Sequence, residues 1–97
     1  MKKAVKYHNQ YLSIAKELGD RAGEGSAYGN LANDYQSLGD FKESVKYHNQ
    51  HLIIAKELGD KAGEETACYS LGADFELSGN LQVALDYYRL IKCKFDQ

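Results

Sequence analysis

Apolar residues recur along this chain at spacings of three and four, which is the period of an α-helix. The segment 41–58 carries two such stripes, so we expect a helix that packs against neighbours on two sides. The first stripe comprises Phe41, Val45, His48, Leu52 and Ala55, and the second comprises Tyr47, His51, Ile54 and Leu58. The preceding segment, 21–38, shows the same spacing at Ala27, Leu31 and Tyr35, which predicts a partner helix.

The pattern repeats along the chain with a period of about 40 residues. The segment YHNQYLSIAKELGDRAGE, residues 7–24, returns as YHNQHLIIAKELGDKAGE at residues 47–64. Such a copied unit cannot bury its apolar face alone, so copies stack on one another. We therefore predict an all-α solenoid of antiparallel helical hairpins with five helices. The predicted single domain, 1–97, consists of a lone helix at 2–18, a hairpin at 21–58 and a hairpin at 61–95.

Glycine and aspartate mark the predicted helix ends. Gly39 is expected to end one helix and Asp40 to cap the next, and the same two residue types recur at positions 59 and 60. Glu43 stands where a capping-box acid would reach back to the Asp40 amide. Glycines inside the helix at 21–38 each cost up to about 1 kcal/mol relative to alanine, unless they let two helices approach closely.

Composition and charge exclude several classes of function. The chain has 12 basic and 14 acidic residues, which gives a formal net charge of −2. No cluster of Lys and Arg is dense enough to bind a phosphate backbone, so we expect no nucleic-acid partner. No apolar run reaches the roughly 18 residues of a membrane span, and the residues after Met1 are too polar for a signal peptide. We interpret Cys68 and Cys93 as free thiols, the alternative being a disulfide between them, and we expect a soluble cytoplasmic protein without membrane contact.

The hairpins resemble the tetratricopeptide repeat (TPR), a family of protein-binding helical repeats. The matching residues are Asn30-Leu31-Ala32, Tyr35, Gly39 and Phe41 in the first hairpin, and Leu71-Gly72, Phe75, Gly79, Leu81, Ala84 and Tyr88 in the second. The long period and the phrases AKELGDRAGEGSAYGNLANDY and AKELGDKAGEETACYSLGADF are similar to the long-repeat subgroup of the Pins/LGN polarity scaffolds. Ala32 and Ser44 depart from the usual family residues but stay small. The resemblance implies a right-handed superhelix.

The resemblance also implies a concave groove, built by the first helix of each hairpin, that binds a partner protein or an extended peptide. Asn33 is the best single candidate for a ligand contact, because a carboxamide both donates hydrogen bonds to a peptide backbone and accepts them from it. The alternative is a solvated polar face with no ligand. The expected groove residues are Ser26, Asn30, Asn33, Gln36, Thr66, Tyr69, Ala73 and Glu76, with Gly29 between them.

Two known groove chemistries do not match these residues. Chaperone-type clamps place basic residues where this chain has Gly29 and Tyr69. The polarity scaffolds place arginine at the positions of Ser26 and Thr66 to meet acidic ligands, because charge-assisted arginine pairs are strong. The groove therefore departs from both patterns, and G-protein regulation does not follow from the resemblance.

Self-association is the second functional hypothesis. The first helix has both apolar stripes without a preceding helix to cover one of them, and the last helix has no capping helix after it. An isologous dimer or head-to-tail stacking would bury these surfaces. The residues expected in this contact are Tyr7, Tyr11, Ile14, Leu85, Tyr88 and Ile91. A third hypothesis is that the chain is an excerpt of a longer repeat array.

Catalysis and cofactor binding are not expected. His48 and His51 lie one helical turn apart, but no third metal ligand is evident. His8 and His48 occupy positions where the repeat family has a core aromatic residue, so we interpret them as packing residues. The glycines of 23–29 do not have the spacing of a dinucleotide-binding loop, and no catalytic Ser/His/Asp or Cys/His set can be placed. The sequence thus predicts a non-enzymatic protein without metal or cofactor.

Overall fold

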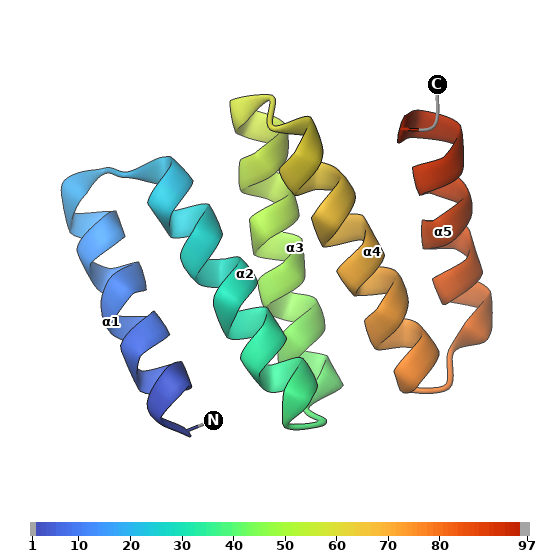
Figure 1. Ribbon diagram of the computed structural model, residues 1–97, viewed down its shortest axis with the longest axis horizontal. Coiled ribbons are helices and arrows are strands. Elements are labelled where there is room, and N and C mark those ends of the chain that lie inside the picture. Colours follow the sequence, from blue (N-terminus) through green and yellow to red (C-terminus); the bar gives the residue numbers. More distant parts are fainter. Residues whose placement is uncertain (1, 96–97) are drawn as a thin grey trace.

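The computed structural model describes residues 2–95, with the side chains of residues 3–92. Five α-helices joined by short turns account for the described chain (Figure 1). They are α1 (Lys2–Leu18), α2 (Arg21–Ser37), α3 (Phe41–Leu58), α4 (Lys61–Leu77) and α5 (Leu81–Phe95). The predicted all-α fold with five helices is confirmed.

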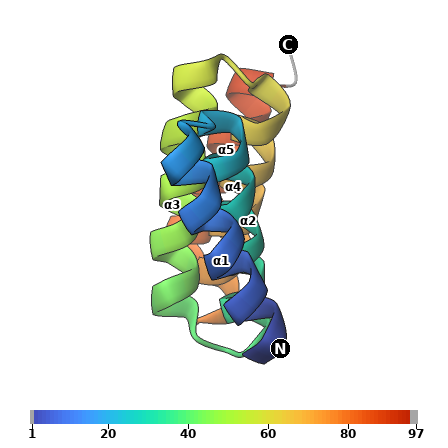
Figure 2. The same ribbon diagram turned by 90° about the vertical axis from the view of Figure 1, so that its left-hand side faces the viewer.

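Each helix packs mainly against its neighbours in the chain. Extensive contacts join α1 to α2, α2 to α3, α3 to α4 and α4 to α5. The helices lie side by side in chain order and run alternately up and down (Figure 1). The molecule measures 37 × 30 × 14 Å, and the view from its edge shows how thin it is (Figure 2). Packing between consecutive helices in a thin, extended molecule is the arrangement of a solenoid.

Glycines at intervals of twenty residues end the first four helices. Gly19, Gly39, Gly59 and Gly79 have φ values of 67°, 79°, 67° and 92°, a left-handed conformation that other residues rarely adopt. In every turn the amide after the glycine donates to the carbonyl five residues earlier, at 2.7–2.9 Å. These bonds satisfy the carbonyls left over at each helix end. The same glycine turn therefore reverses the direction of the chain at all four helix connections.

Aspartates cap the helices that follow three of these turns. The carboxylates of Asp20, Asp40 and Asp60 accept hydrogen bonds from the amide three residues later, at 2.9, 3.2 and 2.9 Å. The predicted cap at Asp40 is thus confirmed. The predicted return bond from Glu43 is wrong, because the Asp40 amide already donates to the Tyr35 carbonyl at 2.9 Å. The turn itself has taken the donor that a capping box would use.

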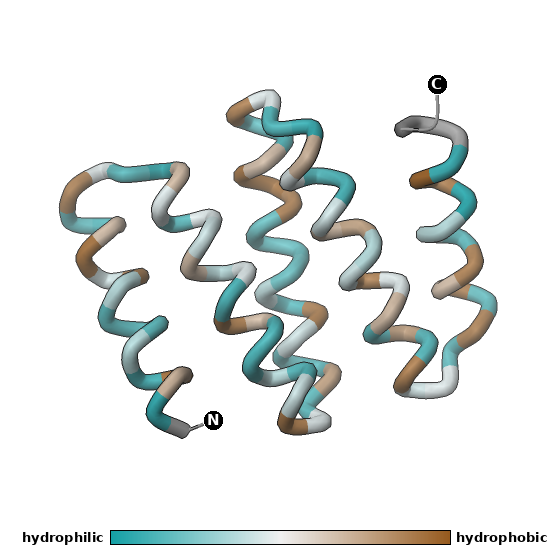
Figure 3. The backbone as a smooth tube through the Cα atoms, viewed as in Figure 1, coloured by the Kyte–Doolittle hydropathy of each residue, from teal (hydrophilic) through white to brown (hydrophobic). Residues whose placement is uncertain are grey.

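The apolar core is divided among the helix pairs. Hydrophobic and hydrophilic residues alternate along each helix, so no helix is apolar on all sides (Figure 3). Leu31, Ile54 and Leu71 are fully buried, one in each of α2, α3 and α4. The ring of Tyr47 stacks between Tyr28 and Tyr35, with centroids 6.0 and 5.7 Å away. Within the described residues, no helix is long and apolar enough to span a bilayer.

Two glycines allow α2 to lie close to α3. A Cβ atom added at Gly25 would lie 3.0 Å from Ile54 Cγ2, and one at Gly29 would lie 3.2 Å from His51 Nδ1. These distances are tighter than most packing contacts. The glycines thus exchange helix propensity for a close approach between helices, as the sequence suggested.

Candidate functional site

A pocket of about 250 Å³ opens where α2, α3 and α4 meet. Its lining contains hydroxyl, carboxamide and imidazole groups, and no Lys, Arg, Asp or Glu. The lining residues are Ser26, Gly29, Asn30, Asn33, His48, His51, Thr66 and Ser70. The pocket therefore offers many hydrogen-bond donors and acceptors without a fixed formal charge.

The structure brings together half of the predicted groove residues in this pocket. Ser26, Asn30, Asn33 and Thr66 line it, along with Gly29. Sequence reasoning did not include the two histidines or Ser70 in the groove. The contribution of the two histidines depends on the packing of α3 between α2 and α4, which helix spacing alone does not give.

The other four predicted groove residues lie outside the pocket. Gln36 is turned toward α4, where its Nε2 donates to Asp74 Oδ1 at 2.7 Å. Tyr69 and Glu76 are exposed on α4, and Ala73 is half-buried between them. These four residues are therefore not part of the pocket lining.

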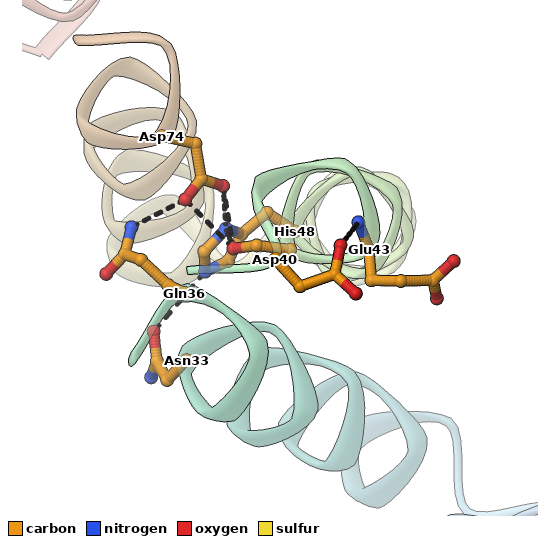
Figure 4. Close-up of polar contacts among 7 residues, drawn as sticks. Asn33, Gln36, Asp40, Glu43, His48 and Asp74 are labelled. Atoms are coloured by element: carbon orange, nitrogen blue, oxygen red, sulfur yellow. Dashed lines mark hydrogen bonds and ion pairs between the residues drawn. The ribbon is translucent and has the colours of Figure 1, made fainter. Parts of the chain in front are cut away.

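A buried carboxylate lies behind the pocket. Asp74 is fully buried and accepts hydrogen bonds from three side chains, two of which, Gln36 and His48, are labelled with it in Figure 4. Gln36 donates at 2.7 Å, His48 Nδ1 donates at 2.9 Å, and the Ser44 hydroxyl lies 2.8 and 2.9 Å from the two carboxylate oxygens. These donors come from α2 and α3, so one carboxylate from α4 fastens three helices together. A buried charge with this many donors is stable where an unpaired one would be costly.

The first repeat contains a simpler version of this contact. His8 Nδ1 pairs with Asp34 Oδ2 at 2.5 Å, across the same 26-residue separation that joins His48 to Asp74. The first pair is partly exposed, with 29% and 13% of the two side chains accessible, whereas the second pair is buried. Position 4 is alanine where position 44 is serine. Both histidines therefore serve helix packing, as the sequence predicted.

The serine, histidine and aspartate of the buried cluster are not arranged for nucleophilic catalysis. In a catalytic triad the serine and the acid contact opposite nitrogens of the imidazole. Here Ser44 Oγ and Asp74 Oδ2 both approach His48 Nδ1, at 3.3 and 2.9 Å, while Nε2 lies 3.3 Å from Asn33 Oδ1 (Figure 4). The cluster thus orients the His48 ring at the pocket wall. Within the side chains described, no three His, Cys, Asp or Glu residues are grouped to hold a metal ion.

His51 is the titratable group of the pocket with a perturbed pKa. Partial burial lowers the pKa of His51 below its ordinary value of 6.5, nearby His48 lowers it further, and Asp60 opposes the shift. The neutral imidazole is therefore favoured in the folded protein.

The residues predicted for self-association divide between exposed and buried positions. Tyr7, Tyr11 and Ile14 are 62%, 43% and 54% exposed on α1. On α5, Leu85 is also exposed, and Tyr88 is half-buried. Ile91 is only 2% exposed, so its assignment to an open surface is wrong: it faces inward, within the protein's own core. Cys68 is buried, whereas the side chain of Cys93 lies outside the described residues.

Replacing Asp74 by asparagine is expected to destabilise the protein by about 3 kcal/mol, because an amide NH2 would then face groups that themselves donate. The matched variant Asp34→Asn removes a single, partly exposed contact and should cost about 1 kcal/mol. Urea unfolding followed by circular dichroism measures both. Equal losses for the two variants would show that the Asp74 network adds nothing to an ordinary His–Asp pair.

The lowered pKa of His51 predicts a dependence of stability on pH. Since the folded pKa lies below the unfolded value near 6.5, the unfolded chain gains its proton first as the pH falls. The stability contributed by neutral His51 is complete above pH 6.5 and is lost as the pH falls from there toward the folded pKa. In urea unfolding at a series of pH values, wild type should lose more stability over this interval than His51→Gln. Parallel pH profiles would contradict the assignment.

Comparison with known proteins gives a consistent result. The family described as tetratricopeptide repeat matches residues 1–57 and 23–90. Over 41 residues the chain is 54% identical to G-protein-signaling modulator 1 of Homo sapiens, and 51% identical to the same protein of Mus musculus. These matches span 42% of this chain and 6% of each relative, so the chain corresponds to a small part of those proteins.

A solved structure shares the fold over almost the whole chain. The TPR domain of Arabidopsis FLU aligns with a TM-score of 0.89, covering 98% of this chain and 80% of that one at 24% identity. Family match and fold agree with the stacked hairpins, the repeated glycine turns and the pattern of buried positions. The chain belongs to the tetratricopeptide repeat family.

Proposed function

We propose that this chain binds a partner protein or an extended peptide through the groove face of α2 and α4. The single observation that carries the proposal is the pocket where Ser26, Asn30, Asn33 and Thr66 meet, since these residues were expected to contact a ligand and lie together around one opening. Tetratricopeptide repeats typically serve protein–protein interactions and not catalysis, which is consistent with this role. We place this activity in the cytoplasm on the basis of composition.

The chemistry of the pocket suits the backbone of an extended peptide. Each carboxamide of Asn30 and Asn33 both donates and accepts, as peptide groups require. His48 is held in place by Asp74 at 2.9 Å, so that part of the wall is ordered before a ligand arrives. A preorganised wall reduces the entropy lost on binding.

The similarity to the G-protein-signaling modulators supports the role of a binding repeat only. The matched segment is 6% of those proteins, and their name describes the full-length proteins. We therefore propose for this chain only the function of an interaction module, and we do not extend G-protein signalling to it.

A selection from a displayed random peptide library tests the proposal. Peptides enriched on the wild type should bind Asn33→Ala about threefold to tenfold more weakly, because one or two hydrogen bonds are lost. Thr66→Phe should also weaken them by filling the pocket mouth. Gln50→Ala, an exposed change on α3 outside the pocket lining, is the control and should leave affinity unchanged. Peptides that bind all four proteins equally would contradict the proposed groove.

We also propose self-association through α1 as a second candidate function. The same repeat position gives contrasting exposures: Ile14 is 54% exposed on α1, whereas Ile54 on α3 is 2% exposed beneath α2. Tyr7 and Tyr11 extend the exposed surface along α1. An apolar helix face of this kind favours contact with another protein surface, including a second copy of the chain.

Sedimentation velocity over a range of micromolar concentrations tests this candidate. The wild type is expected to form dimers or larger species as concentration rises, and Ile14→Glu should remain monomeric because it places a charge in the apolar contact. Ile53→Glu on α3, where the isoleucine is 50% exposed, serves as the control and should associate like the wild type. A wild type that stays monomeric at high micromolar concentration would exclude self-association.

A further inference from the structure

Beside the pocket, the second hairpin presents two tyrosines and a glutamate on one surface. Tyr69 and Glu76 come from α4 and Tyr88 comes from α5; we call them the tyrosine–glutamate cluster. The rings of Tyr69 and Tyr88 have centroids 6.2 Å apart and are tilted by 46°. The Tyr88 hydroxyl donates to Glu76 Oε1 at 3.5 Å, a long hydrogen bond. Tyr69 is 52% exposed and Glu76 is also exposed, so the cluster is open to a ligand.

The cluster has no equivalent in the first hairpin. The repeat positions of Tyr69, Glu76 and Tyr88 hold Gly29, Gln36 and His48, which build the uncharged pocket and its buried support. The groove face therefore changes chemistry along its length. One part offers neutral hydrogen-bonding groups, and the other offers aromatic rings beside a carboxylate.

The ring of Tyr88 is seated against the backbone of α4. A Cβ atom added at Gly72 would lie 2.6 Å from Tyr88 Cε1 and 3.0 Å from Cζ. In the first hairpin the positions of Gly72 and Tyr88 hold Ala32 and His48, whose imidazole is smaller than the tyrosine ring. Gly72 thus makes the room that lets Tyr88 reach Glu76, and the three members of the cluster are held together by packing.

The formal charge among the predicted groove residues is negative. Among the eight predicted groove residues, Glu76 has the only formal charge, and none is Lys or Arg. The negative face of an aromatic ring attracts cations, and a nearby carboxylate adds a charge-assisted contact. The protein itself shows that its tyrosines suit this role, because Lys16 lies 5.8 Å from the Tyr28 ring centre and Lys46 lies 5.2 Å from that of Tyr47.

We propose that the tyrosine–glutamate cluster takes a lysine or arginine side chain of the peptide bound along the groove. The inference rests on the proposed function and specifies the ligand chemistry at one end of the same face. An acidic ligand side chain would meet Glu76 without a compensating Lys or Arg among the eight predicted groove residues. Partial burial raises the pKa of Tyr88, and the charge of Glu76 raises it further, as expected of a phenol facing a carboxylate.

One selection with three proteins tests the proposal: wild type, Glu76→Gln and Glu76→Lys are each used to enrich peptides from the same displayed random library. The wild-type pool should gain Lys and Arg, the Glu76→Gln pool should gain fewer, and the Glu76→Lys pool should gain Asp or Glu instead. Individual basic peptides should bind Glu76→Gln and Tyr69→Ala about threefold to tenfold more weakly than the wild type. Added salt should weaken wild-type binding more than binding to Glu76→Gln.

The outcomes separate this inference from the proposed function. A wild-type pool that is enriched but carries no Lys or Arg preference, or whose preference survives Glu76→Gln, overturns the inference while the groove remains a peptide site. A library that yields no enriched peptides overturns both. Circular dichroism melting of each variant verifies that it is folded, which is expected because Tyr69 and Glu76 are exposed.

Discussion

The arrangement of the central helices depends on one buried carboxylate. Asp74 on α4 is inaccessible to solvent and receives hydrogen bonds from α2 and α3 through Gln36, Ser44 and His48. A charged group in such a place is tolerated only when its donors stand in particular positions, so it fixes how the three helices meet. Apolar packing alone leaves more freedom to slide. The pocket on the groove face lies over this junction and has His48 as part of its wall.

The two halves of the groove face illustrate how a duplicated unit acquires different surfaces. Turns, caps and most of the second helix are copied closely between 7–24 and 47–64, and these parts build the stack. Substitutions gather on the first helix of each hairpin, where Gly29 corresponds to Tyr69. A glycine there admits His51 against the helix, whereas a tyrosine projects outward to a neighbouring ring. The scaffold is conserved within the chain, and the recognition surface is not.

Much of the fold could be read from the sequence because it depends on local signals. Helix period, glycine stops and aspartate caps each act within a few residues, so the five helices and the cap at Asp40 were predictable. Contacts between distant residues were not. Asp74 was overlooked because a lone aspartate on a helix is usually solvated, although the 26-residue spacing shared by His8–Asp34 and His48–Asp74 was a usable signal. Ile91 was misplaced because spacing defines a face without saying which neighbour covers it.

The regular spacing of the glycine turns sets the way this chain can change in length. Gly19, Gly39, Gly59 and Gly79 place successive turns twenty residues apart, and the two His–Asp pairs keep a fixed separation of 26 residues. One inserted residue within a helix rotates everything after it by about 100° and separates a histidine from its aspartate. Gain or loss of a whole repeat keeps the angular phase of every later helix. The architecture therefore resists small insertions and admits growth by duplication.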